Sequence, residues 1–367
     1  MLHQNAPEKL VRDIRSYQVE VSFLGSQACR ELVEAGVRAP RVYSAVCLPD
    51  HHSPLNSKFA LLLEDFSDGW EHLALLGPLE LEAAARELAT IHARFFRIGP
   101  HCTPELEAAV WPSGSYWGPD KQPATLADAL VPEWDRLYGA FESELRLPSD
   151  RHLADLGARL KRHALTVATE THVGSDHRHS TLIHGDAKAG NLFFRPSGGG
   201  GGGLDCSMID FQWTGFGLGA TDVAYLIVSS ADPAALDLTG AHEKMVLEGY
   251  HRCWARAMVD AGVVATVADA VAILPLADLE REYESAVLDL CTSIIAYHWA
   301  LVGATPETLK ERGAKDIPCN SYNKNLDVAL WLMRRCDALL RQREESPPSS
   351  SAKKRRVSPG GHLAGAL

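Results

Sequence analysis

Apolar residues follow two different spacings along the chain. Short apolar runs at 59–63, 192–194 and 206–209 predict strands. Apolar residues recur at helical spacing over longer stretches, at 79–96, 153–171, 241–260, 278–301 and 323–344. The alternation of Tyr17, Val19, Val21 and Phe23 is compatible with either a helix or a strand. The pattern as a whole predicts an α+β protein whose second half is mostly helical.

Two of the predicted strands flank a run of six glycines at 198–203. A phosphate-binding loop mixes glycines with other residues and leads into a helix, whereas this uniform run joins two strands. We therefore interpret it as the flexible tip of a β-hairpin. Such a hairpin places Asn191 at its entry and Asp210 at its exit, on the same edge.

The segments around this hairpin carry acidic and amide side chains in a fixed order. His184-Gly185-Asp186-Ala187-Lys188-Ala189-Gly190-Asn191 precedes it, and Ile209-Asp210-Phe211-Gln212 follows it. Asp186 can accept the proton of an attacking hydroxyl, and Lys188 can offset charge on the transferred phosphoryl group. Asn191 and Asp210 offer the hard oxygen ligands that Mg²⁺ prefers, and His184 is expected to brace the loop. Any one of these motifs is usually a turn or a cap, but the ordered set indicates phosphoryl transfer from a nucleotide.

These motifs resemble the aminoglycoside phosphotransferase and choline kinase-like superfamily. The resemblance runs from about Tyr17 to about Arg341, and Asp-Phe-Gln together with Leu62-Leu63-Glu64-Asp65 is most similar to the ecdysteroid kinase-like branch. It implies a two-lobed protein-kinase-like fold that binds ATP and Mg²⁺ in the cleft. It also implies that Asp186 is the base and that Asn191 and Asp210 hold magnesium.

The resemblance assigns further roles outside the catalytic loop. It implies that Leu62, Leu63 and Glu64 belong to a hinge strand touching adenine. Glu20 matches the glutamate that pairs with a phosphate-binding lysine. Asp222 matches a buried aspartate that braces the catalytic loop, although a helix N-cap is an equally good interpretation from the sequence alone.

The region before Glu20 departs from the family pattern. Only nineteen residues precede it, and they contain no glycine-rich hairpin. Lys9 lies too close to Glu20 to be the expected lysine and is interpreted as a solvated side chain. We therefore expect a small lobe truncated at the N-terminus, with exposed apolar sheet faces and poor local order there. Either the chain begins at an internal methionine of a longer protein, or its nucleotide site is degraded.

The expected organisation is a partial small lobe with the hinge at 1–66, a large lobe at 67–345 and a disordered basic tail at 346–367. Within the large lobe, 111–134 is predicted to be an irregular insert, whose Trp111, Tyr116 and Trp117 either face a cationic substrate or pack at the surface. Trp213, directly after Asp-Phe-Gln, is the best aromatic candidate for substrate contact. The cluster 177–179 is expected to be a solvated loop rather than a metal site.

Composition and charge limit the classes of partner that we expect this protein to bind. The net charge of −11 disfavours nucleic acid and mildly favours a neutral or cationic acceptor. The eight cysteines include no Cys-x-x-Cys, and no apolar stretch approaches the length of a membrane span. We expect a cytoplasmic protein, with nuclear import through Lys353 to Arg356 as an alternative.

Three functions compete. The first is a small-molecule kinase acting on a hydroxyl with Mg-ATP, which the complete set Asp186, Asn191 and Asp210 favours. The second is a catalytically impaired pseudokinase or binding protein, because the phosphate hairpin and strand lysine are missing. A protein kinase is disfavoured, since Gly185 and Gln212 replace the arginine and glycine expected at those positions. The sequence predicts neither the identity of the acceptor nor the oligomeric state.

Overall fold

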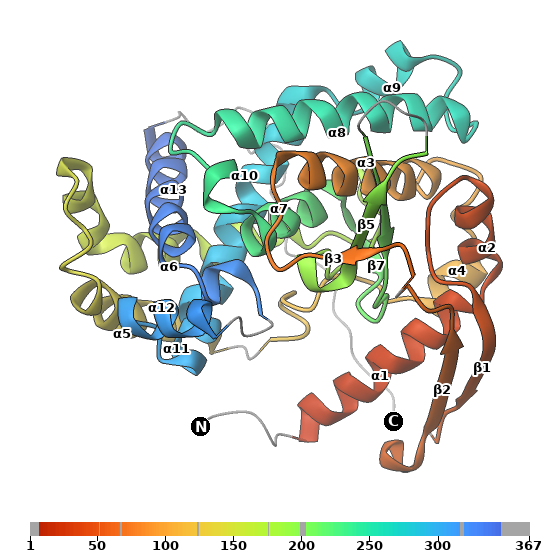
Figure 1. Ribbon diagram of the computed structural model, residues 1–367, viewed down its shortest axis with the longest axis horizontal. Helices are drawn as coiled ribbons and strands as arrows, with labels where there is room; N and C mark the ends of the chain where they lie inside the picture. The colour runs from red at the N-terminus through yellow and green to blue at the C-terminus, as the bar shows by residue number, and fades with distance from the viewer. Residues whose placement is uncertain are drawn as a thin grey trace, which may run out of the picture.

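The computed structural model describes residues 7–50, 52–66, 68–122, 125–174, 176–198, 203–315 and 319–345. The expected tail at 346–367, with Lys353 to Arg356, lies outside the described residues, as do residues 1–6. The described chain is mostly helical with three small antiparallel sheets, as the apolar spacing predicted. The N-terminal elements lie at the bottom and right of the molecule, and the helices within residues 126–171 and 306–345 lie at its left (Figure 1).

The N-terminal elements are two helices and a β-ribbon: α1 (Pro7–Leu24), α2 (Gln27–Glu34), β1 (Val42–Leu48), the 3₁₀ turn η1 (Pro54–Asn56) and β2 (Lys58–Leu63). The ambiguous stretch from Tyr17 to Phe23 is helical, and it buries Val19 and Phe23 one turn apart. β1 and β2 pair with each other in a two-stranded sheet, and α1 packs against both.

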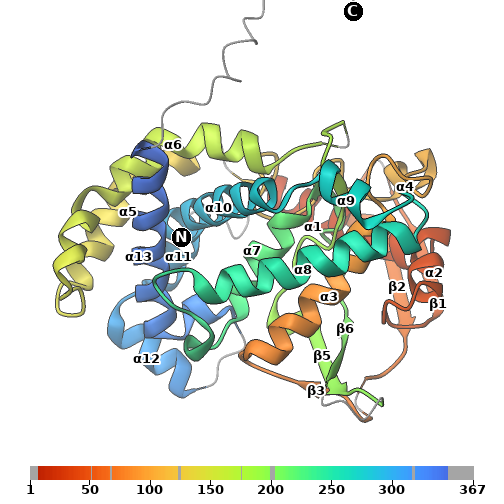
Figure 2. The ribbon, with the colours of Figure 1, turned by 90° about the horizontal axis from the view of Figure 1, so that it is seen from above.

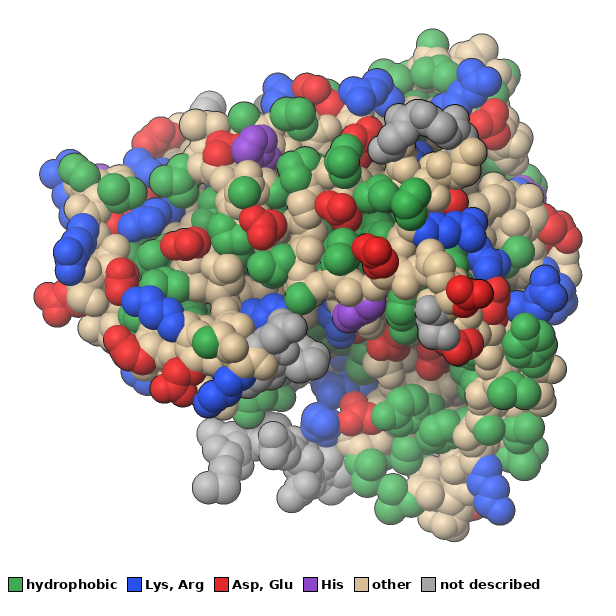
Figure 3. All heavy atoms as spheres, in the orientation of Figure 1, with side chains coloured by type: hydrophobic (Ala, Val, Ile, Leu, Met, Phe, Trp, Pro, Cys, Tyr) green, Lys and Arg blue, Asp and Glu red, His purple; other side chains and the backbone are tan. Residues whose placement is uncertain are grey.

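This ribbon exposes apolar side chains, as the sequence predicted. Tyr43, Leu48 and Leu62 are each about 60% exposed. Figure 3 shows the corresponding cluster of hydrophobic side chains at the lower right, over β1 and β2. A face of this kind is normally covered in a folded protein.

The middle of the chain supplies the strands that carry the predicted motifs. β3 (Glu71–His72), β5 (Leu192–Pro196) and β6 (Leu204–Met208) form one sheet, and β4 (Ser180–Ile183) pairs with β7 (Gly215–Leu218). The β5–β6 hairpin confirms the predicted strands on both sides of the glycine run, with Leu192 opposite Met208 at its base.

The helices form the body of the protein around a continuous apolar core. They are α3 (Pro78–Arg94), α4 (Pro104–Ala109), α5 (Leu126–Ala140), α6 (Leu156–Thr171), α7 (Gly219–Ser230), α8 (Ala241–Asp260), α9 (Val267–Ile273), α10 (Leu276–Ser293), α11 (Trp299–Val302), α12 (Pro306–Ala314) and α13 (Leu326–Glu345). Short turns join them: η2 (Pro148–Asp155), η3 (Ala189–Asn191), η4 (Pro233–Ala235), η6 (Ser321–Asn323) and the π-helical turn η5 (Ile294–His298). Viewed from above, α8 and α3 run side by side (Figure 2), and they pack against each other.

Three sequence expectations need correction. The predicted irregular insert ends early, because 126–134 belongs to α5, which tolerates Pro132 inside it. The 177–179 segment is not a simple solvated loop, because His179 is 2% exposed and its Nδ1 lies 2.5 Å from Glu282 Oε1. One stretch, Leu276–Val302, does have the length and composition of a membrane span, but 72% of its apolar window is buried inside the protein, where α10 packs against α6 and α7.

Candidate active site

The loop between β4 and β5 brings three of the predicted site residues together. Lys188 Nζ lies 2.5 Å from Asp186 Oδ2, and Asn191 Nδ2 lies 2.9 Å from the Asp186 carbonyl oxygen and 3.1 Å from Oδ2. The carboxylate is 2% exposed, and its other oxygen, Oδ1, is buried with no hydrogen-bond partner. A buried carboxylate oxygen without a partner is costly unless a ligand completes it. One carboxylate oxygen of Asp186, Oδ2, is therefore held by Lys188 and Asn191, while the other, Oδ1, has no partner.

Asp210 approaches this loop from the end of β6. The Ile209 N–H donates to the Asn191 carbonyl at 3.0 Å, so the two segments lie side by side. Asp210 has a positive φ of 66°, which is uncommon for a residue with a side chain and recurs at functional sites. Burial, followed by the negative charge of Asp186, raises the pKa of Asp210. Two carboxylates that repel each other beside an amide form a donor set suited to a divalent cation.

Asp222 holds the start of the loop. Its side chain is fully buried and accepts hydrogen bonds from the backbone N–H groups of His184 (2.6 Å) and Gly185 (2.9 Å). His92 Nε2 lies 3.2 Å from the same carboxylate, and its Nδ1 lies 2.8 Å from the Tyr250 hydroxyl. Asp222 is the fourth residue of α7, whose N-cap is Leu218, so the helix-cap interpretation is wrong.

His184 connects the two acidic segments. Its Nε2 lies 3.0 Å from the Ile209 carbonyl oxygen, and its ring packs 4.6 Å from the ring of Phe211. The histidine thus joins the loop between β4 and β5 to the backbone that carries Asp210, which is the position that bracing the loop requires.

Gly185 shows why this loop departs from the protein-kinase pattern. Its φ is +82°, and a Cβ at this position would lie 2.7 Å from the Ser115 nitrogen and nearer still to the Trp213 carbonyl oxygen. A larger residue, such as the arginine of protein kinases, does not fit this backbone approach.

A cavity of about 610 Å³ opens beside Asp210. This volume is within the range of about 300–1,000 Å³ that small-molecule sites occupy. The cavity is lined by side chains from α1, the segment between α2 and β1, the end of β2 and the residues after it, β5 and the segment 209–212. These residues are Tyr17, Glu20, Pro40, Leu63, Glu64, Asp65, Phe66, Phe193, Ile209, Asp210 and Gln212. Tyr17, Phe66 and Phe193 were not predicted as site residues, because single aromatic side chains carry no motif.

The predicted hinge residues divide between the two faces of β2. Leu63 and Glu64 line the cavity, whereas Leu62 is 61% exposed and does not. Strand alternation explains the difference between Leu62 and Leu63, since neighbouring side chains in a strand point to opposite faces, and Glu64 follows the end of β2. Glu64 is also fixed by Arg38, whose Nη2 lies 2.5 Å from its Oε1.

Glu20 reaches the same cavity from α1. Burial, followed by the charge of Asp210, raises its pKa from 4.5 to about 7, while the Phe211 N–H lowers it. Among the ion pairs formed within the described chain, none joins Glu20 to a lysine or arginine. Lys9, the alternative considered from the sequence, instead pairs with Asp13 at 3.1 Å.

The aromatic candidates take different positions. Trp213 is 8% exposed and stacks on Trp111 at 5.8 Å. Trp117 is buried, and its Nε1 donates to Asp289 at 3.1 Å, so it is a core residue rather than a surface one. Tyr116 is partly accessible and contacts Trp213, with ring centroids 6.3 Å apart.

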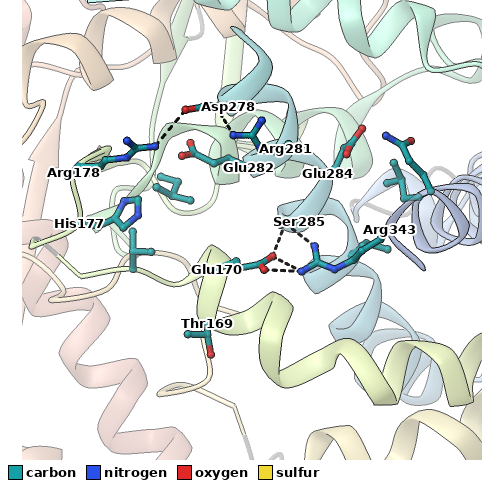
Figure 4. A pocket seen from close by; sticks show the side chains of 15 residues that line it. Thr169, Glu170, His177, Arg178, Asp278, Arg281, Glu282, Glu284, Ser285 and Arg343 are labelled. Atoms are coloured by element: carbon teal, nitrogen blue, oxygen red, sulfur yellow. Dashed lines mark hydrogen bonds and ion pairs between the residues drawn. The ribbon is translucent and has the colours of Figure 1, made fainter. Parts of the chain in front are cut away.

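A second hollow, of about 600 Å³, lies at the opposite end of the β4–β7 ribbon. Figure 4 shows its charged lining from α6, α10 and α13. The charges pair with one another, as in Arg343 with Glu170 at 2.6 Å and Arg178 with Asp278 at 3.3 Å. It contains none of the predicted site residues, which favours the first cavity as the candidate active site.

The acidic loop, the hairpin and the adjoining cavity carry the side chains that phosphoryl transfer requires, and the class of protein follows from a comparison with known families. A model of the phosphotransferase enzyme family matches residues 20–258, and the chain belongs to this family. Its α+β architecture is of the kinase-like type found there. A solved structure described as the microcompartment-associated aminopropanol kinase is 15% identical, with coverage of 94% of this chain and 84% of that one and a TM-score of 0.44. A search of curated proteins gives no match.

Proposed function

We propose that this protein is a kinase that transfers the γ-phosphate of ATP to a hydroxyl of a small acceptor. The observation that carries the proposal is the convergence of Asn191 and Asp210 on Asp186, whose Oδ1 is buried without a hydrogen-bond partner. The family match to phosphotransferases supports the same chemistry.

Asp186 is the proposed base. It takes the proton of the acceptor hydroxyl while that oxygen bonds to the γ-phosphorus, and the bond from phosphorus to the β-phosphate oxygen breaks to release ADP. Lys188, held at Asp186 Oδ2, places a positive charge beside the group in transfer. Asn191 and Asp210 are the residues that would hold Mg²⁺, which neutralises phosphate charge when bound.

The cavity beside Asp210 is the proposed nucleotide site. Leu63 and Glu64 border it at the end of β2, where a hinge would contact adenine, and Glu20 borders it from α1. Leu62 is left out of this assignment, because it lies on the other face of its strand. We assign 1–66 to a small lobe and 67–345 to a large lobe, with the cavity between them.

Within the superfamily, we assign the chain to the ecdysteroid kinase-like branch. The support is the Asp210-Phe211-Gln212 variant of the second motif together with Leu62-Leu63-Glu64-Asp65 upstream.

One observation favours a second candidate function, that of a catalytically impaired binding protein. Glu20 would normally be paired with a lysine that holds the α- and β-phosphates, and none of the described cations forms that pair. A protein of this kind would bind a nucleotide in the cavity without transferring its phosphate.

The two functions separate in one experiment with three variants. Wild type, Asp186→Asn, Asp210→Asn and the control Asp260→Asn, an exposed surface carboxylate, are compared by Mg-ATP thermal shift and by ADP release with a panel of hydroxyl acceptors. The kinase proposal expects Asp186→Asn to lose transfer but keep the nucleotide shift, and Asp210→Asn to lose much of the shift. Transfer that survives in Asp186→Asn would overturn the assignment of the base. A nucleotide shift in wild type without transfer to any acceptor of the panel would favour the binding protein instead.

A further inference from the structure

Gln212, the third residue of the Asp-Phe-Gln segment, contacts three separate parts of the structure. Its Nε2 lies 3.4 Å from Asp210 Oδ2, and its Oε1 lies 3.2 Å from the Ser16 hydroxyl oxygen on α1. Its backbone carbonyl accepts a hydrogen bond from Trp111 Nε1 at 2.8 Å. The side chain therefore connects Asp210, the proposed magnesium ligand, to a helix residue 196 positions earlier in the sequence.

The backbone around Gln212 is fixed by the segment that runs beside it. The N–H of Trp111 donates to the Thr214 carbonyl oxygen at 3.0 Å, and the N–H of Ser115 donates to the Trp213 carbonyl oxygen at 3.1 Å. Trp111 also stacks on Trp213, with ring centroids 5.8 Å apart. Because the backbone is held in this way, the Gln212 side chain starts from a fixed point two residues from the carboxylate that it contacts.

Helix α1 also lies along this segment. The Arg12 guanidinium lies 5.6 Å from the centre of the Trp213 ring, and the Phe23 ring lies 5.1 Å from the Phe211 ring. Arg12, Ser16 and Phe23 are four and seven residues apart, a spacing that places them on one face of a helix. Ser16 is 1% exposed, so its hydroxyl lies inside this contact. The helix therefore touches each of the three residues that follow the proposed metal ligand.

The direction of the Gln212 amide determines what this side chain can do. The Ser16 hydroxyl hydrogen is shared between the Asp13 carbonyl oxygen at 2.8 Å and Gln212 Oε1, so the donor Nε2 faces Asp210. A donor cannot bind a cation, but it can hold one oxygen of a carboxylate while the other remains for the cation. Asp210 needs such a hold, because its φ is positive and the charge of Asp186 repels it.

We propose that Gln212 is a positioning residue for Asp210 and that Ser16 sets the direction of its amide. This inference rests on the proposed role of Asp210 as a magnesium ligand. The contact from Nε2 restricts the carboxylate, so less conformational freedom is lost when the cation binds. The geometry of the metal site thus depends on the position of α1, through a side chain that the glycine of the protein-kinase motif would not supply.

Magnesium titrations of the nucleotide thermal shift test this inference. The shift at fixed ATP is measured against Mg²⁺ concentration, and a parallel ATP titration in EDTA measures nucleotide binding without the metal. Gln212→Met keeps an unbranched side chain of similar size but removes the amide. Ser16→Ala, the double variant and Gln212→Glu complete the set, with Asp210→Asn as the reference for loss of the ligand. Gln27→Met, at an exposed amide on α2, is the control.

Gln212→Met is expected to raise the Mg²⁺ concentration at half-maximal shift about 3- to 10-fold, the effect of one hydrogen bond. Ser16→Ala is expected to raise it about 2- to 3-fold. The double variant should match Gln212→Met, because Ser16 acts through Gln212. Gln212→Glu should also weaken Mg²⁺ binding, since it places a second carboxylate against Asp210. The ATP titration in EDTA and the Gln27→Met control should both stay as in wild type.

An unchanged magnesium midpoint in Gln212→Met and Ser16→Ala, with the shift still lost in Asp210→Asn, would overturn the inference and leave the role of Asp210 standing. Lower urea unfolding midpoints with that same magnesium midpoint would show a merely structural role for both residues. Tighter Mg²⁺ binding by Gln212→Glu would make this side chain a metal ligand instead, and additive single effects would overturn the assignment of Ser16. A wild-type shift that ignores Mg²⁺ would count against the proposed metal site itself, and the inference would fall with it.

Discussion

Replacement of Gly185 by alanine tests the geometry of the catalytic loop most directly. The new Cβ would sit at a positive φ and 2.7 Å from the Ser115 nitrogen, with the Trp213 carbonyl oxygen closer still. A left-handed backbone costs an alanine about 1–2 kcal/mol. Overpacking against backbone adds about 1–3 kcal/mol, because the neighbouring strand cannot move like a flexible side chain. The loss of unfolding free energy should therefore be about 2–5 kcal/mol.

The same loop offers a matched control in Gly190→Ala. Gly190 is exposed, its φ is not positive, and the nearest atom to an added Cβ is Lys188 Cε at 3.6 Å. This substitution should be neutral or stabilise slightly, since alanine loses less backbone freedom on folding. Urea unfolding followed by tryptophan fluorescence measures both variants. Equal unfolding midpoints for the two would refute the close approach of Gly185 to Trp213.

Two further predictions concern the cavity. The pKa of Glu20 is raised from 4.5 to about 7 in the folded protein. Between these pH values the folded protein keeps a proton that the unfolded chain has released. The stability that this group contributes therefore falls as pH rises from about 4.5 to 7. Glu20→Gln should make the urea unfolding midpoint depend less on pH, measured from pH 5 to 8 without magnesium or nucleotide. An unchanged pH dependence would contradict the raised pKa of Glu20. Leu63→Glu should weaken the Mg-ATP thermal shift, because it places a charge in the cavity, whereas Leu62→Glu on the outer face of β2 should leave the shift unchanged. Equal effects of the two substitutions would show that β2 does not border the nucleotide.

Local patterns predicted the parts of this protein in which neighbours in sequence are neighbours in space. The β5–β6 hairpin and the convergence of Asn191 with Asp210 followed from apolar runs on both sides of a glycine tip. The boundaries of α3, α6, α8, α10 and α13 followed closely from spacing, whereas α4, α5, α7, α9 and α12 were not predicted.

The remaining features depend on contacts between distant segments. The face of Leu62 is set by strand register, and the burial of His179 is set by Glu282 on α10. Ser115 and Trp213 have no shared motif, and only the tertiary fold brings them beside Gly185. The helical conformation of α1 was likewise ambiguous. The alternation of apolar and polar residues from Tyr17 to Phe23 fits both a helix and a strand, and the packing of α1 against β1 and β2 is a contact between distant segments.

The anchoring of the catalytic loop by Asp222 has a consequence for turnover. The carboxylate that holds the His184 and Gly185 amides belongs to a helix whose residues are all buried, and it is itself tied through His92 to Tyr250 on α8. Opening this wall of the site would strand an unpaired charge in the core, so its opening is costly in free energy. For the kinase proposed above, we therefore expect exchange of substrate and product to rely on displacement of the opposite wall, formed by α1 and the thin β1–β2 ribbon. Release of product would accordingly be governed by the stiffness of that ribbon rather than by the chemistry at Asp186.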